Sequence, residues 1–311
     1  MLDFLKKIIY KYQDNSIFIF FDKLTYRFLE HRIFEISASL VYFTILSLFP
    51  FLIALLNAIN FTDILSSETL LSYLEYIPQY AKDIVINFIS EINTTSSGGL
   101  FSISVILGLW TSSTIIKQIM KNINLAYGSK DKRNFFKAKA IAFVFTLALI
   151  FMIMLLLSTQ VFGDLIVERI VDYFNLDSAV LSTWNSLSLF FPILYIIVML
   201  VLLYRYSLDP KLRRTVKFKV SIPGAVIATF GSIFVTKLFG YYVKNFSNYS
   251  ITYGSIGSII VLLIWIWLMN MIILLGGEIN AILFSMYSEK NTDILQRKES
   301  VLKNLIKMID E

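Results

Sequence analysis

A single carboxylate closes the longest uncharged stretch of this 311-residue chain. Glu278 follows 33 consecutive residues without Asp, Glu, Lys or Arg, and residues 273–280 read ILLGGEIN. An acid in this position forms an ion pair with a cation of the two basic connections between helices, acts as a gate or contacts a substrate. Gly276 and Gly277 lack side chains, so we expect a second helix or a lipid headgroup to approach Glu278 closely. Asn280 adds an amide just beyond the carboxylate.

The first uncharged stretch, residues 36–62, carries small polar side chains and a proline. Tyr42 and Ser47 lie in it, and Pro50 follows near its middle. Proline removes a backbone hydrogen bond, so we expect a kink at that position. Two interpretations of the polar face remain open. It forms hydrogen bonds between helices, worth about 0.6 kcal/mol each, or it lines a hydrated path.

Two other stretches contain candidate groups. Residues 92–116 end with Trp110 and Ser112, shortly before a lysine. Asn270 lies in the 33-residue run that ends at Glu278, close to the expected middle of a bilayer. A buried amide needs a hydrogen-bonding partner, which is either a neighbouring helix or a ligand.

Small residues recur every four positions in the fifth stretch. Gly224, Ala228 and Ser232 follow this spacing, which predicts close packing of two helices. The stretch is the shortest of the six and contains Pro223, so it is the weakest candidate for a membrane span.

The sequence contains little that suits an enzyme. It has no cysteine, which excludes disulfides, thiolate zinc sites and a cysteine nucleophile. Its one histidine, His31, excludes any site with two imidazoles, and we interpret it as structural or solvated. A phosphate-binding glycine loop and a nucleophile elbow are also missing from the sequence. We expect no enzymatic activity, no metal and no cofactor.

Composition indicates a membrane protein. Hydrophobic residues make up 57% of the chain and charged residues 16%, whereas soluble domains average about 45–50% and 25%. Six stretches of 17 to 33 residues lack any charge, and a helix crosses a bilayer with about 20 residues. We therefore expect an all-α, polytopic bundle of six transmembrane helices, at about 36–60, 98–116, 140–163, 180–204, 220–240 and 256–283.

The cations alternate between the two sides of these spans. The N-terminal segment 1–35, the second and fourth connections and the segment after 284 together hold 24 Lys and Arg, against 4 in the other three connections. By the positive-inside rule, both termini and the basic connections are cytoplasmic. The net charge of +6 then reflects orientation and anionic lipid headgroups, and we expect no nucleic-acid partner.

Four segments outside the spans show amphipathic patterns. Residues 66–93 and 164–176 predict short external helices, which form either a passive lid or a vestibule or docking face. The cytoplasmic segments 1–35 and 284–311 mix cations with apolar residues. Each is either an interfacial helix on anionic lipid or a solvated amphipathic tail.

Four ordered motifs resemble the YihY/virulence factor BrkB family of bacterial inner-membrane proteins. They are SLFP at 47–50, NLAYG at 124–128, YGSIG at 253–257 and GEIN at 277–280, within a resemblance that covers roughly residues 30–285. These motifs add Tyr253, Gly254 and Gly257 to the candidate site residues. The resemblance implies a six-helix membrane bundle in the inner membrane. Some members bear a ribonuclease BN label and others are linked by name to serum resistance.

Three functions remain open at this point. The first is a transporter-like protein that moves a small molecule, a lipid or another amphiphile. The second is a scaffold of the envelope that does not transport, and the third is a membrane-bound ribonuclease, which the lone histidine disfavours. Membrane lipids are the expected partners, with a homo-oligomer as a further possibility.

Overall fold

The computed structural model describes residues 11, 15–60, 98–174, 184, 188, 190–246, 255–288 and 300–302. Within these ranges the chain is helical and has no strand, so the all-α class is confirmed. The helices, in chain order, are α2 (Ser16–Glu30), α3 (Ile33–Asn60), α6 (Gly98–Ala126), α7 (Phe135–Phe174), α9 (Phe190–Ser207), α10 (Pro210–Thr215), the 3₁₀ helix η2 (Phe218–Val220), α11 (Ser221–Phe246) and α13 (Ser255–Ser288).

A sharp turn separates α2 from α3. The Asn15 side chain caps the start of α2 by accepting hydrogen bonds from the backbone amides of Ile17 and Phe18, at 2.8 and 3.4 Å. The helix ends at His31, and Arg32 then adopts a left-handed φ of 52°. This conformation redirects the chain, so that α2 and α3 are two helices rather than one.

Four helices of the described part are long and apolar enough to cross a membrane. These stretches are Phe135–Met152, Phe190–Ser207, Phe218–Asn245 and Ile259–Tyr287. Helices also occupy the first two expected spans, as α3 and α6, but the described apolar part of α3 is the shorter segment Ile33–Ser47. The expected count of six is therefore not confirmed in the described residues, where four helices meet the requirement.

Helix α7 is one continuous helix in a region where we expected two. We expected a span at 140–163 followed by a separate external helix at 164–176, whereas α7 runs through both as one 40-residue helix. At 1.5 Å per residue its length is about 60 Å, roughly twice the thickness of the hydrocarbon core. Gly163 is the one glycine in α7, and a single glycine costs about 1 kcal/mol, too little to end a long helix.

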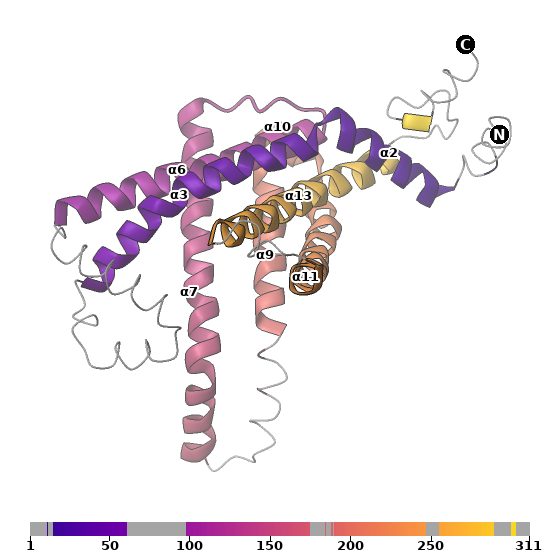
Figure 1. Cartoon of the computed structure of the whole chain (residues 1–311). Coiled ribbons are helices and arrows are strands. Elements are labelled where there is room, and N and C mark those ends of the chain that lie inside the picture. Colours follow the sequence, from indigo (N-terminus) through magenta and orange to yellow (C-terminus); the bar gives the residue numbers. More distant parts are fainter. Residues whose placement is uncertain are drawn as a thin grey trace.

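The helices are not mutually parallel. In Figure 1, α3, α6 and α13 run across the vertical pair α7 and α9. Helix α3 packs along α6, and α13 packs along both α11 and α3. Helix α2 also contacts α13, which brings the N-terminal region to the C-terminal half of the last helix.

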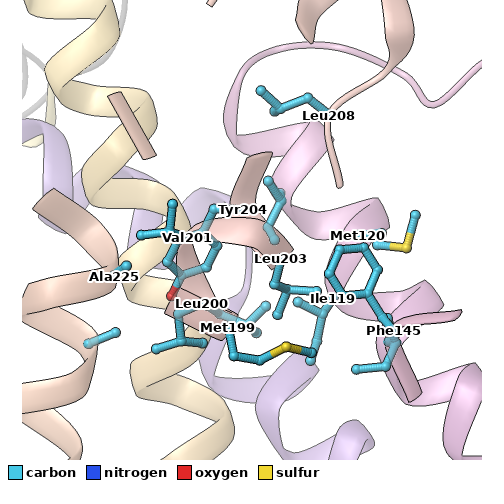
Figure 2. Close-up of a cluster of buried hydrophobic side chains, with 14 of the residues drawn as sticks. Ile119, Met120, Phe145, Met199, Leu200, Val201, Leu203, Tyr204, Leu208 and Ala225 are labelled. Atoms are coloured by element: carbon cyan, nitrogen blue, oxygen red, sulfur yellow. The ribbon is translucent and has the colours of Figure 1, made fainter. Parts of the chain in front are cut away.

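The apolar core lies where α6, α7, α9 and α11 meet. Figure 2 shows Leu203 and Met199 of α9 near Ile119 of α6 and Phe145 of α7, with Ala225 of α11 on the opposite side. Burial of such side chains stabilises helix contacts within the protein. The end of α9 that carries Tyr204 is thereby fixed between α6 and α11.

The C-terminal residues 300–302 contact α2 through Asp22. Ser300 Oγ donates a hydrogen bond of 2.6 Å to the Asp22 carboxylate, and the amides of Val301 and Leu302 donate to it at 3.1 Å each. The expected external helix at 66–93 lies outside the described residues, as do residues 1–10 and 12–14 of the N-terminal segment and residues 289–299 and 303–311 of the C-terminal segment.

Candidate functional site

Glu278 is buried among charged partners near the C-terminal end of α13. Its side chain is 5% exposed. Oε1 lies 2.6 Å from His31 Nδ1, and Oε2 lies 3.5 Å from Arg27 Nη1. A carboxylate has no proton to give, so His31 Nδ1–H donates to Oε1. We call Arg27, His31 and Glu278 the charge cluster.

The spacing of Arg27 and His31 places both side chains on one face of α2. Residues four apart lie one turn apart on a helix, and the buried residues of α2, Ile19, Asp22, Lys23 and Arg27, form a stripe on the same side. Arg27 also lies in the last turn of α2, where the helix dipole favours positive charge, and His31 is the C-cap of this helix. The sequence thus prepares a cationic helix end for a carboxylate.

Arg27 joins a third helix to the charge cluster. Its Nη1 donates a 2.8 Å hydrogen bond to the carbonyl of Ala126, the last residue of α6. Helix ends leave carbonyl groups without partners inside the helix, and the guanidinium satisfies one of them. The charge cluster therefore connects the ends of α2 and α6 to the C-terminal third of α13.

Tyr127 borders the charge cluster as a neutral group. Burial raises the pKa of its hydroxyl above the usual value, an effect that nearby Glu278 reinforces and Arg27 and Arg205 oppose. The phenol therefore stays protonated and adds no negative charge beside Glu278.

One oxygen of the charge cluster is not hydrogen-bonded. Glu278 Oε2 is buried and has no hydrogen-bond partner, although Arg27 lies within ion-pair distance. Most buried polar atoms in proteins have a partner. Asn270, two turns earlier on α13, shows the same feature, because its Nδ2 is buried without a hydrogen-bond partner. Two such atoms on one helix make α13 the strongest candidate for a functional element.

The two glycines before Glu278 allow close contact with other helices. A Cβ on Gly276 would lie 2.2 Å from the Tyr204 hydroxyl and 2.8 Å from the Gly224 carbonyl. A Cβ on Gly277 would lie 3.1 Å from Ile123 of α6. We expected either a helix or a lipid headgroup beside these glycines, and the neighbours in the described structure are helices α6, α9 and α11. Tyr204 also donates to the carbonyl of Ile273 at 2.7 Å.

Asn280 holds α11 against α13. Its Oδ1 accepts from the Gly224 amide at 2.7 Å, and its Nδ2 donates to the Ser221 carbonyl at 3.2 Å. The side chain thus satisfies backbone groups in the first turn of α11. The predicted packing of the small-residue face of α11 appears here, since Gly224 and Ala228 contact Gly276.

The remaining candidates lie apart from the charge cluster. Tyr42 is 65% exposed, Ser47 donates within its own helix to the Thr44 carbonyl at 2.8 Å, and Ser112 is partly buried on α6. Gly257 is buried near the start of α13, and α3 continues through Pro50 as one helix. Tyr253 and Gly254 lie outside the described residues.

Trp110 takes part in a separate contact with α7. The buried ammonium of Lys139 donates to the Trp110 carbonyl at 2.7 Å and to Thr114 Oγ1 at 2.8 Å. The same ammonium lies 4.4 Å from the centre of the Trp110 ring, within the range of a cation–π interaction.

A second polar network connects the basic connections to one another. Asn124 of α6 donates to the Ser207 carbonyl at 2.7 Å and accepts from the Asp209 amide at 2.7 Å. Asp209 in turn accepts from the amides of Lys132 and Lys211, at 3.2 and 3.0 Å. Burial favours the neutral acid, but these amides and the nearby Arg133 and Lys132 charges hold the pKa of Asp209 below its usual value. Asp209 is therefore an ionised cap of α10.

Sequence reasoning missed Arg27 and the role of His31. The expected cations for Glu278 were those of the two basic connections, whereas the partners come from α2. The interpretation of His31 as structural or solvated left out its contact with a carboxylate 247 residues away. The i, i+4 spacing of Arg27 and His31 was a readable sign of a cationic face, but it gave no indication of the partner.

The region that matches a known protein family includes all three residues of the charge cluster. The family described as Virulence factor BrkB matches residues 24–300. The chain belongs to this family. Its membership confirms the resemblance found in the four sequence motifs.

Relatives of this BrkB-family protein are similar over most of their length. The ribonuclease-like protein YfkH of Bacillus subtilis (strain 168) is 35% identical over 264 residues, which are 85% of this chain and 94% of YfkH. A UPF0761 membrane protein of Aliivibrio salmonicida is 27% identical, covering 94% of this chain and 93% of its own. One of Vibrio campbellii is 26% identical, covering 85% and 82%. No solved structure matches the chain.

Proposed function

We propose that this BrkB-family membrane protein is transporter-like and moves a lipid or another amphiphile across the bilayer or between its leaflets. The observation that carries this proposal is the charge cluster, whose carboxylate is buried in the last apolar helix. Buried charges are costly in an apolar setting and mark functional positions in membrane proteins. The unpartnered amide of Asn270 on the same helix adds a second polar group for a passing substrate.

In this proposal the charge cluster is a gate at the cytoplasmic side. It links the ends of α2 and α6 to α13, and its separation would release α13 from the two other helices. The close packing at Gly276 and Gly277 corresponds to the closed state. A gate of this kind gives two discrete arrangements, because packed helices change position in steps rather than continuously.

An amphiphile is the favoured substrate class because of a cavity between α7 and α9. The cavity measures about 470 Å³, and its lining is apolar apart from Arg213 and the hydroxyl of Tyr206. The Arg213 guanidinium lies 5.2 Å from the Tyr206 ring centre. An apolar space with a cation at one end matches a hydrocarbon chain with an anionic head.

The membrane arrangement is part of the proposal. We place the protein in the inner membrane with six spans, adding α3 and α6 to the four apolar helices, and with both termini in the cytoplasm. The supporting observation is the distribution of Lys and Arg, 24 on one set of segments and 4 on the other.

Reconstituted vesicles test the transport proposal. Purified protein in liposomes is assayed for movement of fluorescent phosphatidylglycerol between leaflets, with dithionite quenching of the outer leaflet. A charge-assisted hydrogen bond contributes about 1.5–3 kcal/mol, so loss of the gate contact in Glu278→Gln should accelerate movement at least about tenfold. His31→Ala keeps the Arg27 ion pair and serves if Glu278→Gln folds poorly. Asn270→Leu should slow movement.

Glu35→Gln is the matched control, because Glu35 forms an exposed pair with Arg32 outside the charge cluster. Its rate should equal that of the wild type. Wild-type vesicles no faster than protein-free vesicles, or equal rates in all variants, would rule out the gate.

A non-transporting scaffold is the second candidate, favoured by the close contacts between α13 and its neighbours. Gly276, Gly277 and Asn280 serve packing alone in that case. The same assay separates the two functions, since a scaffold would leave the leaflets unmixed in the wild type.

We assign no enzymatic activity to the chain, although its relative YfkH is named ribonuclease-like. The support is the single histidine and the lack of cysteine in the sequence. Incubation of the purified protein with labelled RNA and divalent cations is the check, and protein-dependent cleavage would reverse this assignment.

A further inference from the structure

A large cavity lies between α6, α7 and the basic connection that joins them. It measures about 740 Å³ and has both polar and apolar walls. The side chains of Lys117, Lys121 and Lys130 line it, with Thr114 and Gln118 as neutral polar groups. The cavity is separate from the charge cluster, whose residues belong to α2 and α13.

The three lysines provide unbalanced positive charge. Among the described residues none of them has a carboxylate within ion-pair distance. Asp131 is the one acid in the lining, and Arg133 neutralises it through two hydrogen bonds of 2.7 Å each. The cavity therefore attracts anions, because its acid is already paired and its ammonium groups are not.

Apolar and aromatic side chains lie among the lysines of the lining. Phe135 and Leu125 contribute to the lining, and Lys117 Nζ lies 3.6 Å from the centre of the Phe135 ring. This contact holds the ammonium beside an apolar part of the lining.

The start of α7 indicates where the cavity lies relative to the bilayer. The apolar stretch Phe135–Met152 begins at its rim, and Phe135 and Phe136 are exposed, at 54% and 81%. Exposed aromatic side chains with adjacent lysines are typical of the layer of lipid headgroups. A ligand in the cavity can thus place its anionic group on the lysines while its chains remain in the hydrocarbon.

We propose that this cavity is a binding site for a phosphate-bearing anion, supplied by the headgroup of an anionic phospholipid. Three ammonium groups match the oxygens of a phosphate, and a basic pocket between transmembrane helices is suited to such headgroups. The proposal does not depend on transport, because a scaffold would bind the same lipid.

Native mass spectrometry of the purified, detergent-solubilised chain tests the site. The wild type should retain phosphatidylglycerol at least about tenfold better than phosphatidylcholine, since each lysine contributes about 1 kcal/mol. The triple variant Lys117→Gln/Lys121→Gln/Lys130→Gln should lose this preference. Lys121→Gln/Lys130→Gln, which keeps the Lys117–Phe135 contact, should lose part of it and serves if the triple variant is unfolded.

The matched control is Lys137→Gln/Lys211→Gln/Arg214→Gln, which removes the same charge from exposed positions outside the lining. The control should keep the preference for phosphatidylglycerol. Equal losses in both triple variants, or no preference in the wild type, would overturn the site. Displacement of the lipid by millimolar inorganic phosphate would support phosphate recognition but assign it to a soluble ligand.

Discussion

Arg27 and Glu278 each lose almost all of their water when the chain folds. Their side chains are 4% and 5% exposed, and they lie 3.5 Å apart. Removing one partner of a buried pair leaves the other charge uncompensated, which costs more than the pair itself contributes. At the residue scale, the charge cluster is therefore sensitive to single substitutions.

The first prediction concerns the carboxylate. We expect Glu278→Gln to lower the free energy of unfolding by about 3–5 kcal/mol, because Arg27 remains buried without its counter-ion. Denaturant or thermal unfolding in detergent measures this change. Glu35→Gln removes an acid from a pair exposed at 54% and 72%, so its effect should stay within about 1 kcal/mol. Similar effects of the two variants would contradict burial as the cause.

A second prediction at this scale concerns two glycines of α11. A Cβ on Gly224 would lie 2.0 Å from the Gly276 carbonyl oxygen, a backbone atom that cannot move aside easily. We expect Gly224→Ala to destabilise the fold by about 1–3 kcal/mol through overpacking.

Gly240→Ala is its control on the same helix, because a Cβ there has nothing within 4 Å. This variant should be neutral or gain up to about 1 kcal/mol from alanine's better helix propensity. A neutral result for Gly224→Ala would show that α11 and α13 are further apart than described.

The sequence predicted the elements better than their contacts. Runs of uncharged residues located helices, because a bilayer imposes a minimum length. The position of Glu278 predicted an ion pair, but the partner on α2 depends on a turn at Arg32 that folds this helix back onto α13. One helix, α7, covers the two segments expected on either side of Asp164, since a change from apolar to amphipathic sequence does not require a helix to end.

At the element scale, Asn124 is the main link between α6 and the chain that leaves α9. It is fully buried and bonds to the Ser207 carbonyl and the Asp209 amide. Because these partners are backbone groups 83 and 85 residues away, one side chain fixes the relative positions of both basic connections.

The third prediction tests this link. We expect Asn124→Leu to lower the free energy of unfolding by about 2–5 kcal/mol, since it leaves buried backbone groups without partners. Asn122→Leu makes the same chemical change, but within the described part of the chain the Asn122 side chain bonds only to the Gln118 carbonyl of its own helix. Its effect should be below about 1 kcal/mol. Thermal melting in the same detergent compares the two variants.

At the scale of the whole molecule, four or six spans give the same location for the termini. Both counts are even, so both chain ends lie on one side of the membrane in either case. The connection at residues 61–97 distinguishes them. With the proposed cytoplasmic termini, it is external if α3 and α6 both cross the membrane, and cytoplasmic if the first crossing is α7.

The fourth prediction follows from the lack of native cysteine, which makes single-cysteine labelling clean. With six spans, Ser67→Cys should react with a membrane-impermeant maleimide from outside intact cells. Ser178→Cys, beyond α7, is external in both arrangements and serves as the positive control. Ser129→Cys, between α6 and α7, is cytoplasmic in both and should react only after lysis. Protection of Ser67→Cys would reduce the protein to four spans.

The contact between His31 and Glu278 has a consequence for biogenesis. The two residues are 247 positions apart, so a ribosome that adds 5–20 residues per second makes the carboxylate roughly 12 to 50 s after the imidazole. During this interval Arg27 and His31 lack the Glu278 carboxylate, and the phosphate of an anionic headgroup can take its place beside Arg27. The contacts of Arg27 and His31 with Glu278 therefore form only after α13 has left the insertion machinery.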